Sequence, residues 1–431
     1  MNLKKYYNLG KNILYPINRS LTGDGTKKTL KIIKNQFKDF KIKSIKSGSK
    51  VFDWTIPPEW NVKEAYVEDK YGNKIIDFKN NNLHLLGYSI PIRKKILKRE
   101  LLSRIDVLEK QPNAIPYICS YYKKNWGFCT SFNHKQIIKN KYKEKDYFNI
   151  VIDSKLDKNG LLNYGELVLR GKSKEEILIS TYICHPSMAN NELSGPIVTM
   201  GLIDYFKKKE KKLKKTIRFV FVPETIGSIT YLSQNLRNLK ENVTGGFVIS
   251  CIGDEKNHSC MFTKYENSPS DEAILEAYKK LKIKKYKVYT FLDRGSDERQ
   301  YNSPGIDLNI ASIFRTKYGE YPEYHTSLDD FKLVTYKGIL GGFRVAKEAI
   351  ENLQKKIVPK NIYLGEPQLG KRNLYSDKTS KYTNHRQAQY MNFLQYADGR
   401  SSLERIAFKI NISLKKTKKI FGLLVKNKLI N

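Results

Sequence analysis

Histidine and oxygen-bearing side chains gather in one short stretch of this chain, residues 177–195. His185 follows directly on the apolar run ILISTYIC, and Asn190, Asn191 and Glu192 come within seven residues of it. Imidazole nitrogens and carboxylate oxygens are the side-chain atoms that hold zinc in proteins. The stretch therefore predicts a metal site that includes His185.

Ionisable side chains also occur in four later segments, at the ends of apolar runs or in glycine-marked loops. They are Glu224 after VFVP, Asp254 after GFVISCIG, Asp297 in RGSDER and His325 in YHTSLDD. Taken singly, a histidine is usually a hydrogen-bonded structural residue and an acid usually faces solvent. Together they fit a catalytic zinc, which keeps about three protein ligands and leaves a position for water.

The run before His185 is rich in β-branched residues and stops at His185 and Pro186, which is typical of a buried strand in a parallel sheet. In open α/β sheets, ligands bind beyond the carboxyl ends of such strands. Strand-like and helix-like segments alternate here, which predicts an α/β fold with a mixed sheet flanked by helices. The expected strands are 148–153, 165–170, 177–184, 217–222, 246–251, 287–292 and 310–314, and the expected helices are 195–208, 228–236, 271–281 and 336–356.

Changes in sequence character divide the chain into three units. Residues 47–133 contain short alternating runs, a Pro-Pro break and a Tyr-Gly-Asn turn, which indicate a small inserted β domain. The α/β domain then comprises residues 1–46 and 134–355. Residues 356–385 are polar and irregular, so we expect a linker there. Residues 386–431 predict three short amphipathic helices, the pattern of a winged-helix or helix-turn-helix module.

The chain of 431 residues carries 79 lysine and arginine residues against 43 acidic ones, a formal net charge of +36. Such an excess often marks a protein that binds nucleic acid or an anionic membrane surface. Here the lysines are spread from end to end, which indicates a general compositional bias. The charge therefore does not favour nucleic acid as a partner, although the C-terminal module leaves that partner open.

The five cysteines contain no CxxC pair, which argues against a disulfide framework or a cysteine-rich zinc site. The N-terminal residues carry charges but no apolar signal-peptide core. No run approaches the roughly 18 apolar residues of a membrane span. We expect a cytoplasmic protein with reduced thiols and no membrane association. The sequence leaves open whether the protein forms a homo-oligomer.

The motifs also resemble those of known proteins. His185 with ANNELSG, followed by PETIGS, GSDER and YHTSLDD, resembles the zinc aminopeptidase superfamily, which includes leucyl aminopeptidases and glutaminyl cyclases. A bacterial aminopeptidase-like family of unassigned activity is more similar, through RSLTGDG, DWTIPPEW, PYICSYYKKNWGFC, CHPSMANNELSGP and GEYPEYHTSLDD. This resemblance covers nearly the whole chain. It implies a peptidase-like domain with an inserted small β domain of unknown function and a following winged helix.

The resemblance implies roles for individual residues. His185 matches the first metal histidine, His325 the last, and Glu224 the general base. Thr225 stands where the superfamily has a glutamate ligand, and Asn191 stands where it has a metal-bridging aspartate. An amide is neutral and is a poorer zinc ligand than a carboxylate. These departures favour one zinc ion per chain over two.

Two acids and two arginines complete the predicted site. Asp254 lies near the place of a strand-borne aspartate ligand, although Ser250 fits that register as well. Asp297 matches the aspartate of a serine-aspartate loop, and we group it with Glu224 as a catalytic residue. Arg294 and Arg315, like Arg19, are candidates for binding a carboxylate or phosphate through two hydrogen bonds.

We expect a zinc-dependent hydrolase of amide bonds, an aminopeptidase or related amidase of the metalloprotease type that acts on small peptides or amide conjugates. The metal would polarise the scissile carbonyl, and Glu224 would take a proton from water. The alternative is a non-catalytic binding or regulatory protein on an aminopeptidase scaffold, whose winged helix contacts a partner or DNA. Asn191 and Thr225 favour the alternative, whereas His185, Glu224 and the HTSLDD motif favour the enzyme.

Overall fold

Eight strands of the α/β part form one mixed sheet. Their order across the sheet is β1 (Lys41–Lys46), β10 (Leu161–Leu169), β12 (Thr216–Val222), β11 (Glu176–Tyr182), β13 (Val243–Ile249), β16 (Ile310–Phe314), β14 (Ser259–Met261) and β15 (Lys287–Tyr289). The four strands from β12 to β16 run parallel, and each side of this group continues with an antiparallel neighbour. The computed structural model describes residues 2–374 and 385–431, so the predicted linker residues 375–384 lie outside the described part.

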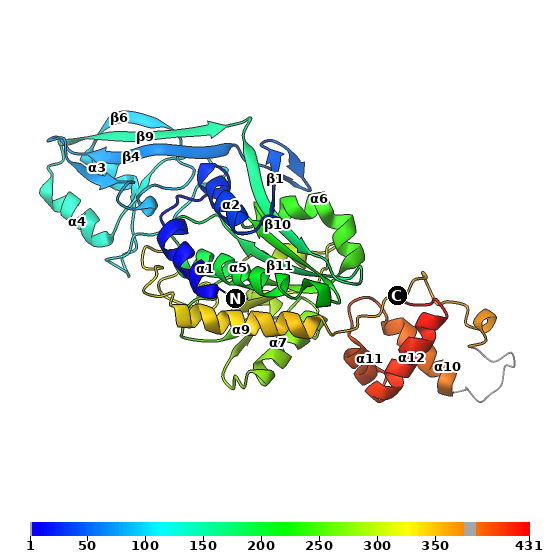
Figure 1. The fold of residues 1–431 in the computed structure, drawn as a ribbon. Coiled ribbons are helices and arrows are strands. Elements are labelled where there is room, and N and C mark those ends of the chain that lie inside the picture. Colours follow the sequence, from blue (N-terminus) through cyan, green and yellow to red (C-terminus); the bar gives the residue numbers. More distant parts are fainter. Residues whose placement is uncertain (1, 375–384) are drawn as a thin grey trace.

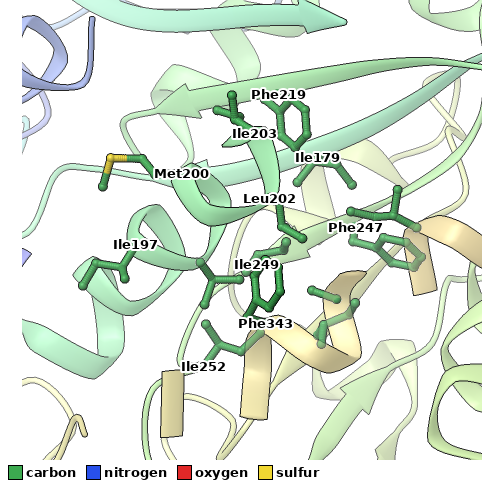
Figure 2. Close-up of a cluster of buried hydrophobic side chains, with 14 of the residues drawn as sticks. Ile179, Ile197, Met200, Leu202, Ile203, Phe219, Phe247, Ile249, Ile252 and Phe343 are labelled. Carbon is green, nitrogen blue, oxygen red and sulfur yellow. The ribbon is translucent and has the colours of Figure 1, made fainter. Parts of the chain in front are cut away.

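Side chains of the sheet alternate between two hydrophobic cores. Ile177 and Ile179 of β11 belong to one core, while Leu178 between them belongs to the other. The pleat causes this alternation, because it points successive side chains to opposite faces of the sheet. Figure 2 shows part of the first core, in which Ile179, Phe247 and Phe343 lie in one cluster. Since both faces are covered, every residue of β11 is buried, which explains why its sequence, EILISTY, is mostly apolar.

Helices cover both faces of the large sheet, as expected, and the predicted α/β class is confirmed. The first core contains side chains of α5 (Ser194–Lys207), α7 (Pro269–Lys280) and α9 (Tyr336–Leu353), and α1 (Leu3–Leu9) packs on α5. The second core contains side chains of α6 (Ile226–Asn242) and α8 (Glu298–Tyr301). Figure 1 shows α5, α7 and α9 on one side of the sheet, and α2 (Asp24–Gln36) packs against β1 and β10.

A second, antiparallel sheet has the order β5 (Lys74–Asp77), β4 (Glu59–Glu68), β9 (Tyr147–Asp157) and β6 (Ile92–Leu97). Residues 148–153, predicted to be a strand of the α/β sheet, lie in β9 and pair with β4 instead. Phe148, Ile150 and Ile152 are buried at every second position, which is the period of an antiparallel strand with one covered face. The small β unit therefore extends past residue 133, the boundary expected from the sequence.

Shorter elements complete residues 47–141. They are β2 (Lys50–Val51), β3 (Trp54–Thr55), α3 (Lys98–Ser103), β7 (Ile105–Asp106), β8 (Phe128–Cys129) and α4 (Phe132–Lys141). Of these, α3 and α4 lie at the upper left of Figure 1, whereas β2 contacts α6.

Three C-terminal helices form a separate module beyond the end of α9 (Figure 1). They are α10 (His385–Tyr396), α11 (Leu403–Lys409) and α12 (Leu414–Lys426), and they enclose a core that includes Phe393, Ile406 and Leu424. Lys360 pairs with Asp398, and Asn361 pairs with Ile430, in isolated β-bridges. Part of the predicted linker is thereby bound to the module. In the described part of the chain, no helix is both long and apolar enough to cross a membrane.

Candidate metal centre and active site

Parallel strands end together at one edge of the large sheet, and the candidate residues follow them. His185 comes after β11, Glu224 after β12 and Asp254 after β13, as expected where parallel strands share a carboxyl edge. Just after His185, Ala189–Leu193 forms a π-helical turn that leads into α5, a geometry often found at functional sites. His325 comes from the loop before α9, and its ring centroid lies 5.4 Å from that of His185.

A buried carboxylate holds the His185 ring. Glu192 accepts hydrogen bonds from the His185 backbone N–H and from Nδ1, the latter at 3.2 Å. Its other oxygen pairs with Arg19, and all three side chains are almost fully buried. With the proton on Nδ1, the other ring nitrogen, Nε2, lies 3.6 Å from Oε2 of Glu224. Nε2 of His185 and Oε2 of Glu224 then both carry lone pairs, which repel each other. A proton or a metal cation between the two atoms removes this repulsion.

The pKa of His185 reflects the same surroundings. Burial lowers the pKa of His185, but the hydrogen bond to Glu192 and the charge of Glu224 outweigh burial, so the pKa is raised. The pocket therefore stabilises positive charge at this imidazole.

The second imidazole is neutral and accessible to a ligand atom. His325 stacks on Tyr324 with 4.0 Å between ring centroids, and its Nε2 is buried without a hydrogen-bond partner among the described residues. Burial and then the charge of His185 lower the pKa of His325 to about 3. Its backbone φ of 54° is left-handed, a conformation that non-glycine residues adopt mainly at turns and functional sites. A neutral imidazole with a free nitrogen suits a metal ion.

Glu224 is fixed through both its backbone and its carboxylate. Its N–H donates to the sulfur of Cys184 at 3.1 Å, and the Ser296 hydroxyl donates to Oε1. Burial raises the pKa of Glu224 despite the opposing charge of His185. The next residue, Thr225, has a φ of 63°, which is rare for a β-branched residue. A partly buried carboxylate with a raised pKa, held beside a strained turn, suits general-base chemistry.

Asp297 supports the turn that carries Glu224. Its Oδ1 accepts hydrogen bonds from the Thr225 N–H at 2.7 Å and from the Ser228 hydroxyl at 2.8 Å. Burial and then the charge of Glu224 raise the pKa of Asp297 to about 8. These contacts support a positioning role for Asp297, and the catalytic role expected from the sequence stays a prediction.

The side chain of Asn191 makes few hydrogen bonds, whereas its backbone N–H is hydrogen-bonded to a carboxylate. Its Oδ1 accepts a long hydrogen bond of 3.4 Å from the Tyr182 hydroxyl, and Nδ2 has no partner within the described ranges. The N–H groups of Asn190 and Asn191 donate to the Asp329 carboxylate at 2.5 and 2.9 Å. Asp329 thus ties the loop of His325 to the loop that follows His185. Sequence analysis assigned it no role, and only its place in HTSLDD draws attention to it.

Asp254 is engaged away from the two histidines. Its carboxylate accepts hydrogen bonds from the N–H and the hydroxyl of Thr316, from the Lys256 N–H and from the Asn190 amide, at 2.7 to 3.2 Å. These four bonds satisfy both oxygens. Metal ligation by Asp254 stays a prediction, and its observed contacts hold the Asn190 side chain and the Thr316 backbone.

Neither of the two arginines predicted to bind substrate is hydrogen-bonded to His185, Glu224 or His325 in the described part of the chain. Arg294 is exposed, and its guanidinium lies over the Phe291 ring and donates to the Phe291 carbonyl. Arg315 is 8% exposed and lies against Gly341 of α9. Among the residues that the structure describes, neither guanidinium is hydrogen-bonded or ion-paired to the histidines or to Glu224. The structure brings His185, Glu224 and His325 together and leaves both arginines outside.

The inserted β unit contributes a wall of the site. Pro116 pairs with Thr326 in an isolated β-bridge, and the Tyr117 N–H donates to the His325 carbonyl at 2.9 Å. The Tyr117 ring lies 5.1 Å from the ring of His185 and 5.2 Å from that of His325, between centroids. Sequence analysis missed Tyr117, because nothing in PYICSYY links it to a distant histidine.

The donor atoms fit a metal ion. Ligand atoms of Cys184, His185 and Glu192 lie within 4.8 Å of one another and could hold a cation. Glu192, however, is already ion-paired, and burial raises the pKa of the Cys184 thiol well above its usual value. We therefore favour the free Nε2 of His325 together with Nε2 of His185. Two imidazoles and an oxygen ligand from Glu224 or Asn191 match the three protein ligands of a catalytic zinc.

Fold and site together define an aminopeptidase-like protein. A zinc aminopeptidase from Bacillus subtilis superposes with a TM-score of 0.60 at 12% identity, covering 81% of this chain and 93% of that one. An M28 peptidase precursor from Shewanella amazonensis gives a TM-score of 0.56 at 11% identity, covering 82% and 96%. At such low identity these similarities establish the fold alone.

The chain belongs to the family described as a domain of unknown function, DUF4910, which matches residues 7–356, and a winged helix-turn-helix family matches residues 357–431. A Clostridium acetobutylicum protein, provisionally described as a polysaccharide biosynthesis protein with an aminopeptidase-like domain, is 41% identical over 412 residues, covering 94% of this chain and 91% of its own. A solved structure from the same organism, provisionally described as a peptidase, is 38% identical with a TM-score of 0.78 and covers 100% and 96%. The predicted aminopeptidase-like family with a C-terminal winged helix is confirmed.

Proposed function

We propose that this protein is a zinc-dependent hydrolase of amide bonds in small substrates. One observation carries the proposal: Nε2 of His185 lies 3.6 Å from the Glu224 carboxylate, beside the unpartnered Nε2 of His325. A zinc ion held by the two histidines, with an oxygen ligand from Asn191, would supply a Lewis acid for the scissile carbonyl and would make water more acidic.

The protein's own groups position the reactants and move the proton. Glu224 takes a proton from the attacking water and returns it to the leaving amine, a role that its raised pKa favours. Ser296 fixes one oxygen of that carboxylate and leaves the other facing His185. Glu192 orients the His185 ring, and Asp297 holds the backbone turn after Glu224. The Glu224 carboxylate and the His185 imidazole are therefore oriented before the substrate binds.

The wall at Tyr117 limits the size of the substrate. Pro116 pairs with Thr326 and the Tyr117 N–H bonds the His325 carbonyl, and this close approach of the segment to His325 supports a preference for small substrates. The arrangement favours short peptides and amides of small molecules. The description of the Clostridium acetobutylicum relative adds amides carried on sugars to these candidates.

The test begins with elemental analysis of the purified protein. Aminoacyl amides, short peptides and N-acylated amino sugars are then screened with the native protein and with Glu224→Gln. We expect zinc in both proteins and hydrolysis only by the native one. Glu241→Gln, which changes an exposed glutamate, is the matched control and retains activity. A zinc-loaded native protein that cleaves none of these amides would contradict the proposal.

A second candidate function is a binding protein on the same scaffold. Asn191 and Thr225 favour it, because both stand where the superfamily has metal-binding carboxylates, and the winged helix-turn-helix module supports a macromolecular partner. This function predicts that the screened amides bind equally to native protein and to Glu224→Gln and are recovered intact. Calorimetry and product analysis separate the two candidates.

A further inference from the structure

A small cavity of about 250 Å³ lies between the loop after β13 and the first turns of α9. It is lined by Glu255, Arg315, Lys337, Leu340, Gly341 and Arg344. Three of these six residues are cationic and one is anionic. The cavity is smaller than the roughly 300–1,000 Å³ of sites for drug-sized ligands, so it suits a small ion or a single charged group.

Arg315 is a buried cation without a counterion. Only its backbone is hydrogen-bonded, to Cys251 and Ser259, and in the part of the chain that the structure describes its guanidinium has no hydrogen bond or ion pair. Its Nε is fully buried. Burial lowers the pKa of Arg315 despite the charges of Asp254 and Glu255. Because an uncompensated buried charge is unfavourable, the surroundings of Arg315 require an anion.

A ring nitrogen of a nearby histidine also lacks a partner. Nδ1 of His258 is buried beside the Tyr278 ring and, within residues 2–374 and 385–431, has no hydrogen-bond partner. The two rings lie 6.3 Å apart between centroids. Burial and then the charge of Arg315 lower the pKa of His258 to about 4, so the ring is neutral and carries one N–H. Buried polar groups are normally satisfied, so unpaired donors gathered at one place indicate a missing ligand.

Gly341 makes room for the guanidinium. A Cβ at this position would lie 2.2 Å from Nη1 of Arg315 and 3.8 Å from Cε1 of His258. Glycine is less favourable than alanine inside a helix. Its presence within α9 is therefore explained by the space that Arg315 occupies beside the cavity.

We propose that this cavity, the Arg315 pocket, binds an oxyanion of the size of phosphate. Arg315 provides the buried guanidinium, and the exposed Lys337 and Arg344 add positive charge at the surface. Glu255 offsets the charge of Lys337, with which it is ion-paired at 2.6 Å, and it also accepts a hydrogen bond from the Thr335 hydroxyl at 2.6 Å, so the net positive charge of the lining comes from Arg315 and Arg344. A guanidinium binds phosphate oxygens through parallel N–H groups, which matches the unpartnered state of Arg315.

The test is calorimetric titration of the full-length protein with inorganic phosphate, in a buffer free of phosphate and sulfate. We expect one site per chain with a Kd of about 1 mM or tighter. Gly341→Ala displaces the guanidinium without removing any charge, and Lys337→Gln/Arg344→Gln removes two surface cations without disturbing the interior. Each should weaken binding about tenfold or more, the order expected for charge-assisted hydrogen bonds.

Matched controls show whether weaker binding comes from the Arg315 pocket itself or from a general effect of adding a methyl group or removing two positive charges. Gly422→Ala adds a methyl group at an exposed helical glycine with open space around it, and Arg237→Gln/Lys211→Gln removes the same two charge types at exposed positions. Both should bind phosphate as the native protein does. A second titration with glucose 1-phosphate identifies the source of the anion: tighter binding than inorganic phosphate assigns the pocket to a phosphorylated metabolite, and weaker binding assigns it to free phosphate.

Three results would overturn the proposal. One is the absence of phosphate binding at millimolar concentration. Another is equal weakening by the pocket variants and their controls, which would reveal non-specific attraction to a basic protein. The third is binding that is lost in His325→Ala but kept in Gly341→Ala, which would place the anion at the candidate metal centre.

Discussion

The rings of His185 and His325 lie 5.4 Å apart between centroids, tilted by 39°, and the Tyr117 ring contacts both. The two histidines come from different loops at the carboxyl edge of the sheet. Glu192 fixes the proton of the first on Nδ1, and burial keeps the second neutral. Each imidazole is therefore prepared to present a nitrogen lone pair to the same space.

Metal content provides the first prediction. Because Asn191 and Thr225 are neutral, we expect at most one tightly bound zinc per chain, and His325→Ala should lower the zinc content by deleting the proposed ligand. Elemental analysis before and after dialysis against a chelator measures both. His134→Ala, which changes a histidine of α4, is the control and should keep full zinc content. Two metals per chain at full occupancy would contradict this expectation.

Substrate size provides the second prediction. Tyr117→Ala removes the ring beside both imidazoles, so the preference of the enzyme for short substrates should decrease. The measurement is the ratio of kcat/KM for an aminoacyl amide to kcat/KM for an octapeptide. Tyr117→Phe keeps the ring and should keep the ratio. An unchanged ratio in Tyr117→Ala would show that this wall does not limit the substrate.

Much of the fold was predictable because its signals are local. The run ILISTYIC identifies β11, and its strand end identifies His185 as a candidate ligand, since burial on both faces and the carboxyl edge follow from the sequence pattern. Glu224 follows the same logic after β12. Residues 148–153 show the limit of such signals: an apolar strand is recognisable, but which sheet it joins depends on its partner β4.

The supporting contacts of the site were not predictable in the same way. Tyr117 and Arg19 act on the histidine loops from remote parts of the sequence, and no spacing rule links them to the histidines. Asp329 lies in the same motif as His325, but its bonds to the loop after His185 follow only from the fold. Arg315 shows a related limit. Its residue type indicated an anion partner, but only the fold shows that it points to a separate cavity beside α9 rather than to the histidines.

The C-terminal module provides the third prediction. Lysines 415, 416, 418 and 419 are exposed on α12, yet lysine is abundant throughout the chain. We expect weak binding to duplex DNA that is indifferent to sequence and falls steeply with salt, because phosphate contacts release counterions. Fluorescence anisotropy at two salt concentrations measures this. Lys415→Gln/Lys416→Gln and the control Lys211→Gln/Lys212→Gln should reduce binding about equally. Sequence-selective binding at physiological salt, lost only in the first variant, would contradict it.

The buried pair of Arg19 and Glu192 provides the last prediction. Glu192→Gln leaves the Arg19 guanidinium buried without its counterion, which should lower the free energy of unfolding by about 3–5 kcal/mol. Urea denaturation followed by circular dichroism measures the change. The exposed Glu241→Gln should shift stability by less than about 0.5 kcal/mol.

A double variant separates the structural role of this pair from its role at the metal centre. Arg19→Met/Glu192→Gln removes the stranded charge and should recover a large part of the lost stability, since a buried ion pair can often be replaced by uncharged side chains. Zinc affinity should stay about 10–100-fold below the native value in both variants, because the His185 ring has lost the carboxylate that orients it. If zinc affinity returns together with stability, Glu192 serves the fold alone and does not position the candidate ligand.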